Sequence, residues 1–208
     1  MRTLFVGDVH GCSQELAALL ALARPDRLIL VGDLFTKGPD APGVWARIQE
    51  EKAEAVLGNH DDLLLRKPEK AAALGLPEAA LDWLRGLPLS ISGEGPQGPW
   101  LVIHAGVHPE LGLAGTSRDR ALVMRRFPDD TDPAHPYWWQ RWSGPPLVIY
   151  GHDAVRGLQD HRPRSLGLDT GCVYGGALSG FLLEEGRVLS VPALRAWAAV
   201  QGPPPGRV

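Results

Sequence analysis

Residues 3–33, TLFVGDVHGCSQELAALLALARPDRLILVGD, decide the fold. Two short apolar runs, TLFVGD at 3–8 and RLILVGD at 27–33, flank the segment SQELAALLALA at 13–23. The runs are typical of strands, and the segment between them is typical of a helix with Ser13 suited to its N-cap. A helix that joins two strands predicts parallel pairing and a right-handed crossover.

The same alternation continues along the chain. The segment 41–51, APGVWARIQEE, predicts a second helix with Asp40 as its cap, and an apolar run ending at Gly58 predicts a third strand. The order of these elements is β-α-β-α-β. Residues 63–85 then predict helices that are broken at two prolines, Pro68 and Pro77.

The second half of the chain changes to strands joined by tight turns. The apolar runs that predict these strands are 87–92, 100–106, 146–152, 177–185 and 187–191. Between two of them, the Pro- and Trp-rich segment 107–145 predicts a functional flap. We therefore expect an α/β fold, a sandwich of two mixed β-sheets flanked by helices, with one domain at 1–201 and a disordered tail at 202–208.

Composition excludes several classes of protein. The 208 residues are 44% hydrophobic and 22% charged, as in an ordinary globular chain, and the net charge of −3 argues against non-specific binding to nucleic acid or to an anionic membrane. The strand pattern begins at the N-terminus, so no signal peptide is predicted, and no apolar stretch is long enough to span a bilayer. Two cysteines do not make a disulfide framework. A cytoplasmic location is therefore expected, and the oligomeric state is left open.

Acidic and imidazole side chains recur where predicted strands end. The motifs are GDVHG, GDLFTKGPD, GNHD, IHAG and YGHD, and the residues are Asp8, His10, Asp33, Asn59, His60, His104 and His152. Each motif alone is compatible with an ordinary turn, but open α/β sheets bind ligands at the carboxyl ends of their strands, so we expect the whole set to converge. Oxygen and imidazole donors without thiolate suit two divalent metals such as Mn, Fe, Co or Zn. One carboxylate must bridge such a pair, and Asp33 is the natural choice because its strand is central.

These motifs resemble the signature blocks of the calcineurin-like metallophosphoesterases, in the branch that contains the phosphoprotein phosphatases. The resemblance covers residues 4–185. Within that branch, GNHD, HAG and the block LDTGCVYGGALS at 168–179 are similar to the bacterial diadenosine tetraphosphatases and the ApaH-like phosphatases. The resemblance implies a metallophosphoesterase-type sandwich and a two-metal hydrolase.

The resemblance also implies a role for each residue. One metal is bound by Asp8, His10 and Asp33, and the second by Asp33, Asn59, His104 and His152, with manganese as the first choice and Fe, Co, Zn or Mg as alternatives. A hydroxide bridging the metals attacks phosphorus, and His60 is the general acid. The neutral amide oxygen of Asn59 serves as a ligand without adding negative charge to a site that receives a phosphate anion.

The chain departs from the protein phosphatases at two positions. They carry Asp and Arg where this sequence has Thr36 and Lys37. Lys37 keeps a positive charge for phosphate but lacks the bidentate geometry of arginine. Because Thr36 cannot act as a carboxylate partner of His60, either Asp61 or a backbone carbonyl is expected to orient that imidazole.

Further substrate contacts are expected outside the motifs. The pair Arg125 and Arg126 lies where the family places a phosphate-gripping arginine; Arg125 is preferred, although both are equally compatible with a solvated helix face. Tyr174 is a weaker candidate for lining the pocket. The tryptophans of the flap are expected to form its packing core rather than to stack on a base: Trp138, Trp139 and Trp142.

The expected function is hydrolysis of phosphoanhydride bonds in dinucleoside polyphosphates, with diadenosine tetraphosphate as the preferred small-molecule substrate. The alternative is a serine/threonine phosphoprotein phosphatase that uses the same metal site. A third hypothesis, a nucleotide-binding scaffold without activity, is disfavoured by the full set of metal ligands.

Overall fold

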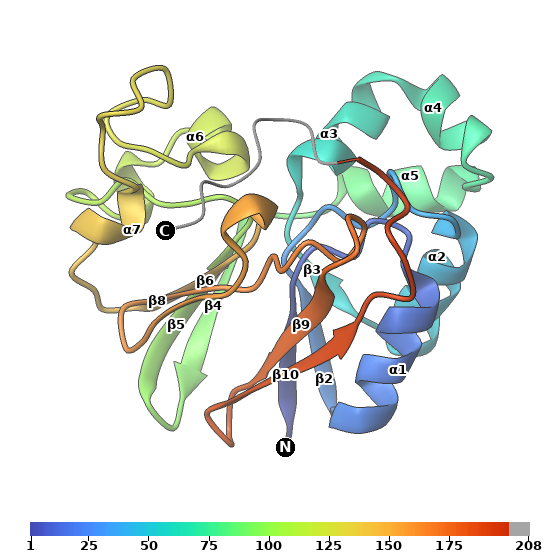
Figure 1. Ribbon diagram of the computed structural model, residues 1–208, viewed down its shortest axis with the longest axis horizontal. Coiled ribbons are helices and arrows are strands. Elements are labelled where there is room, and N and C mark those ends of the chain that lie inside the picture. Colours follow the sequence, from blue (N-terminus) through green and yellow to red (C-terminus); the bar gives the residue numbers. More distant parts are fainter. Residues whose placement is uncertain (200–208) are drawn as a thin grey trace.

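The computed structural model describes residues 1–199, and the predicted tail at 202–208 lies outside the described residues. Two five-stranded sheets pack face to face with helices on the outside, which confirms the expected α/β sandwich (Figure 1). Both sheets contain parallel and antiparallel pairs. The assignment of residues 1–201 to one domain stays a prediction.

The first sheet contains, in spatial order, β10 (Arg187–Pro192), β9 (Ala177–Leu182), β1 (Thr3–Val6), β2 (Arg27–Leu30) and β3 (Glu54–Ala55). β1 pairs in parallel with β2, and β2 with β3, which confirms the parallel β-α-β-α-β unit. β9 and β10 form an antiparallel hairpin, and β9 pairs with β1. The central strands of this sheet therefore end at a common edge.

The second sheet contains, in spatial order, β4 (Ser90–Gly95), β5 (Gly98–Ile103), β6 (Leu147–Tyr150), β8 (Ser165–Gly167) and β7 (Gln159–His161). β5, β6 and β8 run parallel, and β4 and β7 are antiparallel edge strands. The sequence analysis missed β7 and β8, because three residues are too few to show a periodic pattern. Each sheet thus has three parallel strands.

Strand residues alternate between the space separating the sheets and an outer layer, as the period of two requires. Leu4 and Val6 of β1 pack with the helices, whereas Phe5 between them faces the second sheet. There its ring meets Trp100 of β5 edge to face, with centroids 5.0 Å apart. The next residue, Leu101, faces the outer layer of the second sheet. The core therefore has three layers, one between the sheets and one outside each.

Helices cover the outer face of the first sheet (Figure 1). They are α1 (Ser13–Ala23), α2 (Ala41–Glu50), α3 (Asn59–Arg66), α4 (Pro68–Ala73) and α5 (Glu78–Arg85). Pro68 opens α4 and Pro77 immediately precedes α5, so the predicted breaks are confirmed. No helix within residues 1–199 is long and apolar enough to cross a membrane.

Two helix starts test the predicted caps. Asp40 caps α2, because its Oδ1 accepts a hydrogen bond from the backbone N–H of Gly43 at 2.9 Å. The prediction for Ser13 was wrong, since Cys12 occupies the N-cap of α1 and the Ser13 hydroxyl donates to Asp40 instead. Ser13 therefore links the starts of α1 and α2.

The segment 107–145, which we call the flap, packs against the outer face of the second sheet. It contains the 3₁₀ turn η1 (Leu113–Gly115) and two short helices, α6 (Arg118–Val123) and α7 (Trp138–Arg141). Trp138 and Trp142 are buried there, which confirms the packing role expected for them. Trp139 is only partly buried and stacks between Tyr137 and His161.

Candidate active site

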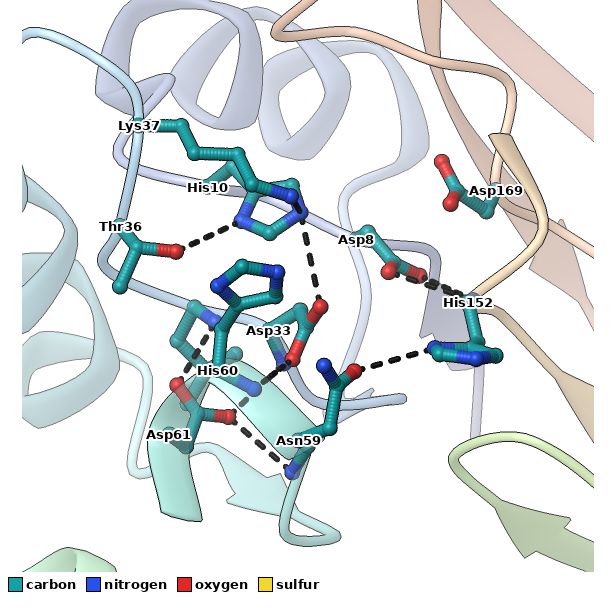
Figure 2. Close-up of polar contacts among 12 residues, drawn as sticks. Asp8, His10, Asp33, Thr36, Lys37, Asn59, His60, Asp61, His152 and Asp169 are labelled. Atoms are coloured by element: carbon teal, nitrogen blue, oxygen red, sulfur yellow. Dashed lines mark hydrogen bonds and ion pairs between the residues drawn. The ribbon is translucent and has the colours of Figure 1, made fainter. Parts of the chain in front are cut away.

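Strand ends from both sheets surround a cavity of about 400 Å³. The residues from the sequence analysis that line it are Asp8, His10, Asp33, Lys37, Asn59, His60, Arg125, His152 and Tyr174. His104 is fully buried and contacts two of the lining residues, Asp33 and Asn59. The structure therefore brings the expected residues together (Figure 2).

The backbone at this site is strained. Four lining residues have φ angles in the left-handed region: His10 at 47°, Asp33 at 55°, Lys37 at 70° and His152 at 71°. Within residues 1–199, only two other non-glycine residues have such angles. Strain of about 1–3 kcal/mol per residue persists where the surrounding structure enforces it, and it concentrates at functional sites.

The glycines of the motifs allow the strand ends to pack closely on each other. A Cβ atom on Gly58 would lie 2.2 Å from the backbone N of Asp33, and one on Gly151 would lie 1.9 Å from Oδ1 of Asp8. Either side chain would collide with a carboxylate residue of the cavity. The glycines are therefore required by contacts within the chain itself.

Asp33 occupies the centre of the site. Its Oδ2 lies 3.5 Å from Nε2 of His10, and its Oδ1 lies 3.5 Å from Nε2 of His104. Oδ1 also accepts a hydrogen bond from the backbone N–H of His60 at 2.8 Å. Each carboxylate oxygen thus faces a different imidazole, as a carboxylate shared by two metal ions should.

Two imidazoles point unprotonated nitrogens into the site. Nδ1 of His104 lies 2.8 Å from the carbonyl oxygen of Val31, and Nε2 of His152 lies 3.1 Å from that of Val123. A carbonyl can only accept, so these nitrogens carry the proton. Burial lowers the pKa of both rings and keeps them neutral, which leaves a lone pair on each inner nitrogen.

Both lone pairs meet the side chain of Asn59. Its Oδ1 lies 2.9 Å from Nε2 of His104 and 3.0 Å from Nδ1 of His152. Three acceptors at such distances repel one another unless a cation lies among them. Carbonyl hydrogen bonds that hold the outer nitrogens are also the usual support of metal-binding histidines. Without a metal, we expect the Asn59 amide to turn over and donate to both rings.

The carboxylates also favour cations. Asp8, Asp33 and His104 each offer a donor atom within 4.8 Å of the others. Burial raises the pKa of Asp8 well above its ordinary value, with further contributions from Asp169 and Asp33, and raises that of Asp33 to about 7. A bound cation would reverse these shifts by stabilising the charged carboxylates. The donor set therefore fits divalent metal ions.

Of the two candidates for orienting His60, Asp61 was wrong, and a backbone carbonyl stays a prediction. The Asp61 carboxylate is fully buried and accepts hydrogen bonds from the backbone N–H groups of Asp33, Leu34 and Gly58, at 2.8, 3.0 and 3.2 Å. Asp61 thus ties α3 to the loop after β2 (Figure 2). Its role is to hold Asp33 in its strained conformation.

His60 lies on the first turn of α3, which begins at Asn59 and not at the predicted residue 63. Its imidazole packs edge to face against that of His10, with ring centroids 5.2 Å apart. Burial, and next the positive charge of Lys37, lower the pKa of His60 to about 4. The ring is therefore neutral at pH 7 in the free protein.

Thr36 and Lys37 surround His10. The Thr36 hydroxyl lies 3.1 Å from Nδ1 of His10, so it positions a predicted metal ligand and not His60. The Lys37 ammonium donates to the hydroxyl of Tyr174 at 2.7 Å and lies 3.4 Å from Nε2 of His10. Lys37 is thus held at the cavity by an aromatic residue that lines the same cavity.

The two neighbouring arginines have different surroundings. Arg125 lines the cavity, donates to the backbone carbonyl of His152 at 3.1 Å and lies 3.7 Å from the Asp153 carboxylate. Arg126 instead bonds within the flap, to the carbonyl of His135 and to the hydroxyl of Tyr137. Only Arg125 of this pair lines the cavity within the described part of the chain.

Several lining residues were missed by the sequence analysis. Asp169 follows the unpredicted strand β8; its carboxylate lies near Asp8 (Figure 2), and burial raises its pKa to about 6. Its only signal was its place in the quoted block at 168–179. Tyr137, Asp153 and Arg156 also line the cavity. Each belongs to a segment without periodic pattern.

Comparisons with known proteins agree with this site. Residues 1–182 match the family model described as calcineurin-like phosphoesterase. The chain is 34% identical to the symmetrical bis(5'-nucleosyl)-tetraphosphatase of Ralstonia nicotianae, over 84% of this chain and 86% of that protein. It is 28% identical to the protein of the same name from Methylobacillus flagellatus, over 92% and 95% of the two chains.

A solved structure extends the agreement to three dimensions. The crystal structure named "putative diadenosine tetraphosphatase" superposes with a TM-score of 0.82 at 36% identity, over 92% of this chain and 93% of that one. The family to which the model refers uses a pair of divalent metal ions, which accords with the donor set around Asp33. Motifs, fold and comparisons lead to one conclusion, that the chain belongs to the calcineurin-like phosphoesterase family.

Proposed function

We propose that the protein hydrolyses phosphoanhydride bonds of dinucleoside polyphosphates, with diadenosine tetraphosphate as the preferred substrate. The observation that carries the proposal is the composition of one cavity, in which carboxylates and neutral imidazoles lie beside the cationic side chains of Lys37, Arg125 and Arg156. Such a site suits a substrate with several phosphates. The names of the relatives in Ralstonia nicotianae and Methylobacillus flagellatus support the same substrate class.

The proposed metal ligands are those expected from the sequence. Asp8, His10 and Asp33 would hold one ion, and Asp33, Asn59, His104 and His152 the other, with manganese as our first choice of metal. Bound divalent ions polarise phosphoryl oxygens and lower the pKa of water towards neutrality. Thr36 would position His10 for this task through the hydrogen bond to Nδ1.

The remaining polar residues would hold the substrate. Lys37 and Arg125 line the cavity with cationic groups that can pair with a phosphate. Tyr174 keeps the Lys37 ammonium in place. The Arg125 guanidinium is positioned by the carbonyl of His152, one of the proposed metal ligands.

We propose that His60 protonates the leaving group. Its pKa of about 4 means that the free protein holds it neutral at pH 7. A bound polyphosphate brings several negative charges close to the ring and raises its pKa, so that the proton would be taken up with the substrate. Substrate binding and protonation of His60 are then coupled.

A serine/threonine phosphoprotein phosphatase is the alternative for the same site. Thr36 disfavours it, because this residue bonds to His10 and leaves His60 without a carboxylate partner among the described residues.

A cytoplasmic location stays a prediction from the sequence.

The test is a comparison of substrates with the metal-loaded protein. Diadenosine tetraphosphate, inorganic polyphosphate, capped RNA and a phosphoserine peptide would be incubated separately and the products resolved by chromatography. We expect kcat/KM for the dinucleotide to exceed that for the peptide by orders of magnitude. Comparable values, or a preference for the peptide, would favour the protein phosphatase.

A further inference from the structure

One wall of the cavity is formed by the 3₁₀ turn η2, Ala154–Arg156, which the sequence analysis did not single out. The turn begins two residues after His152, a proposed metal ligand that lies two residues beyond the end of β6. Val155 and Arg156 are both exposed at the cavity, with 41% of Val155 and 37% of the Arg156 side chain accessible. The turn thus presents one apolar and one cationic side chain beside the metal ligands.

Two arginines pack against the ring of Tyr137 in the flap. The guanidinium carbon of Arg156 lies 3.7 Å from the ring centroid and that of Arg126 lies 4.2 Å from it. The ring also stacks on Trp139, with centroids 5.5 Å apart and an angle of 10° between the planes. Tyr137 is therefore occupied by protein groups and acts as a support for Arg156.

Arg126 and Arg156 differ in whether their guanidinium nitrogens already form hydrogen bonds with protein groups. Arg126 uses its terminal nitrogens on the carbonyl of His135 and the hydroxyl of Tyr137. Arg156 makes its shortest ionic contact through Nε, 3.5 Å from Asp153, and its guanidinium makes no hydrogen bond within residues 1–199. The planar fork of its terminal nitrogens is therefore free for an anion.

The charge balance at this wall also favours an anion. One carboxylate, Asp153, faces two guanidiniums, since Oδ1 lies 3.7 Å from Nε of Arg125 and Oδ2 lies 3.5 Å from Nε of Arg156. Burial first, and then the positive charge of Arg126, lower the pKa of Arg156.

We propose that Arg156 binds the phosphates next to the one under attack, and so makes the site selective for polyphosphate chains over single phosphates. The substrate named here rests on the proposed function. Arg156 lies on the η2 turn, beyond His152 and on the far side of the Asp153 carboxylate from Arg125, so we expect a nucleoside diphosphate to contact it more closely than a single phosphate held by Lys37 and Arg125. The apolar side chain of Val155 lies beside Arg156 to receive the nucleoside.

The test measures equilibrium binding of ADP and of inorganic phosphate to the metal-loaded full chain by calorimetry. In Arg156→Ala we expect the Kd of ADP to rise about tenfold, the value of one charge-assisted contact, and the Kd of phosphate to change by less than about twofold. Arg156→Lys should recover part of the ADP affinity, because it keeps the charge but not the fork. The matched control is Arg126→Ala, which removes the other arginine on Tyr137 and should leave the Kd of both ligands within about twofold.

Three results would overturn the inference. They are an equal loss of affinity for ADP and phosphate in Arg156→Ala, no loss for either ligand, and a loss of ADP affinity in Arg126→Ala equal to that in Arg156→Ala. Binding is measured without turnover, so the outcome does not depend on the identity of the substrate. A wild-type protein that binds ADP through Arg156 but fails to cleave diadenosine tetraphosphate would refute the proposed function and leave this inference standing.

Discussion

The two sheets contribute to the cavity in different ways. Three parallel strands of each sheet end there, β1, β2 and β3 in the first and β5, β6 and β8 in the second. At the edge of the first sheet the site residues bond to one another: Asp61 accepts from the backbone of Asp33, and Asp33 accepts from that of His60. The residues at this edge therefore fix one another's positions through their own hydrogen bonds.

The edge of the second sheet depends on other parts of the molecule. His104, directly after β5, donates to the carbonyl of Val31 after β2, and His152 after β6 contacts the carbonyl of Val123 in the flap. The backbone N–H of His152 also faces the Asp8 carboxylate, at 3.2 Å from each oxygen. From this difference we propose that the first edge carries the groups for phosphate chemistry in general, and that the second edge joins them to the flap and to substrate selection.

The largest effect should come from the centre of the first edge. Asp33→Ala removes the carboxylate that faces both His10 and His104, so we expect kcat/KM to fall by roughly four orders of magnitude or more for every phosphoester tested. Steady-state kinetics on a dinucleotide and on p-nitrophenyl phosphate would measure this. If kcat/KM fell with only one of the two substrates, the first edge would also select substrates, and the proposed difference between the two edges would be wrong.

His60→Asn should show a smaller effect that depends on the leaving group. Positioned acid catalysis contributes typically ~10²–10⁴-fold, and we expect a loss of that order with an alkyl phosphate and a much smaller one with p-nitrophenyl phosphate, whose leaving group needs no proton. Metal content should stay at the wild-type value. An equal slowing of all leaving groups, or loss of a metal, would contradict the acid role.

The neighbours Asp61 and Asp62 test, through the free energy of unfolding, how far the first edge depends on its own hydrogen bonds. Asp61→Ala leaves three buried backbone N–H groups without their acceptor, so we expect the free energy of unfolding to fall by about 3 kcal/mol or more. Asp62 pairs with Arg66 and Arg118 at the surface, and Asp62→Ala should cost less than about 1 kcal/mol. Urea denaturation of both variants measures the two values. Equal costs would show that the first edge is not held together by Asp61.

The smallest effect concerns the support of His10. Thr36→Val removes the hydroxyl at Nδ1 while keeping the shape of the side chain, and we expect metal affinity to fall about 10- to 100-fold. Thr36→Ser, which keeps the hydroxyl, is the matched control and should bind metal nearly as well as the wild type. If a metal titration gives the same affinity for Thr36→Val and Thr36→Ser, Thr36 does not support metal binding through His10.

The sequence was most informative where regular β-α units carry the motifs. Asp8, His10, Asp33 and Asn59 follow strands of the parallel unit, so their shared edge could be predicted from strand order alone. Asp169 was missed because β8, the strand before it, has three residues and no recognisable pattern. Residues that follow recognisable strands were therefore predictable, whereas Asp169 and the lining residues Tyr137, Asp153 and Arg156 were not.

One wrong candidate, Asp61, and one omission, Arg156, have simpler physical causes. Asp61 is adjacent to His60 in the sequence, but successive residues of a helix point about 100° apart, and Asp61 turns towards the buried loop. Arg156 resembles any surface charge in the sequence. Its surroundings come from Tyr137 in the flap and from Asp153, which only the folded chain brings together.

The most direct test of the central claim is the number of metal ions bound per chain, measured by elemental analysis after loading and desalting. Asp33 lies between His10 and His104, with one carboxylate oxygen towards each ring. We predict two ions in the wild-type protein, one in His10→Ala and none in Asp33→Ala. Two ions retained in Asp33→Ala would contradict the shared carboxylate, and with it the two-metal site on which the proposed function depends.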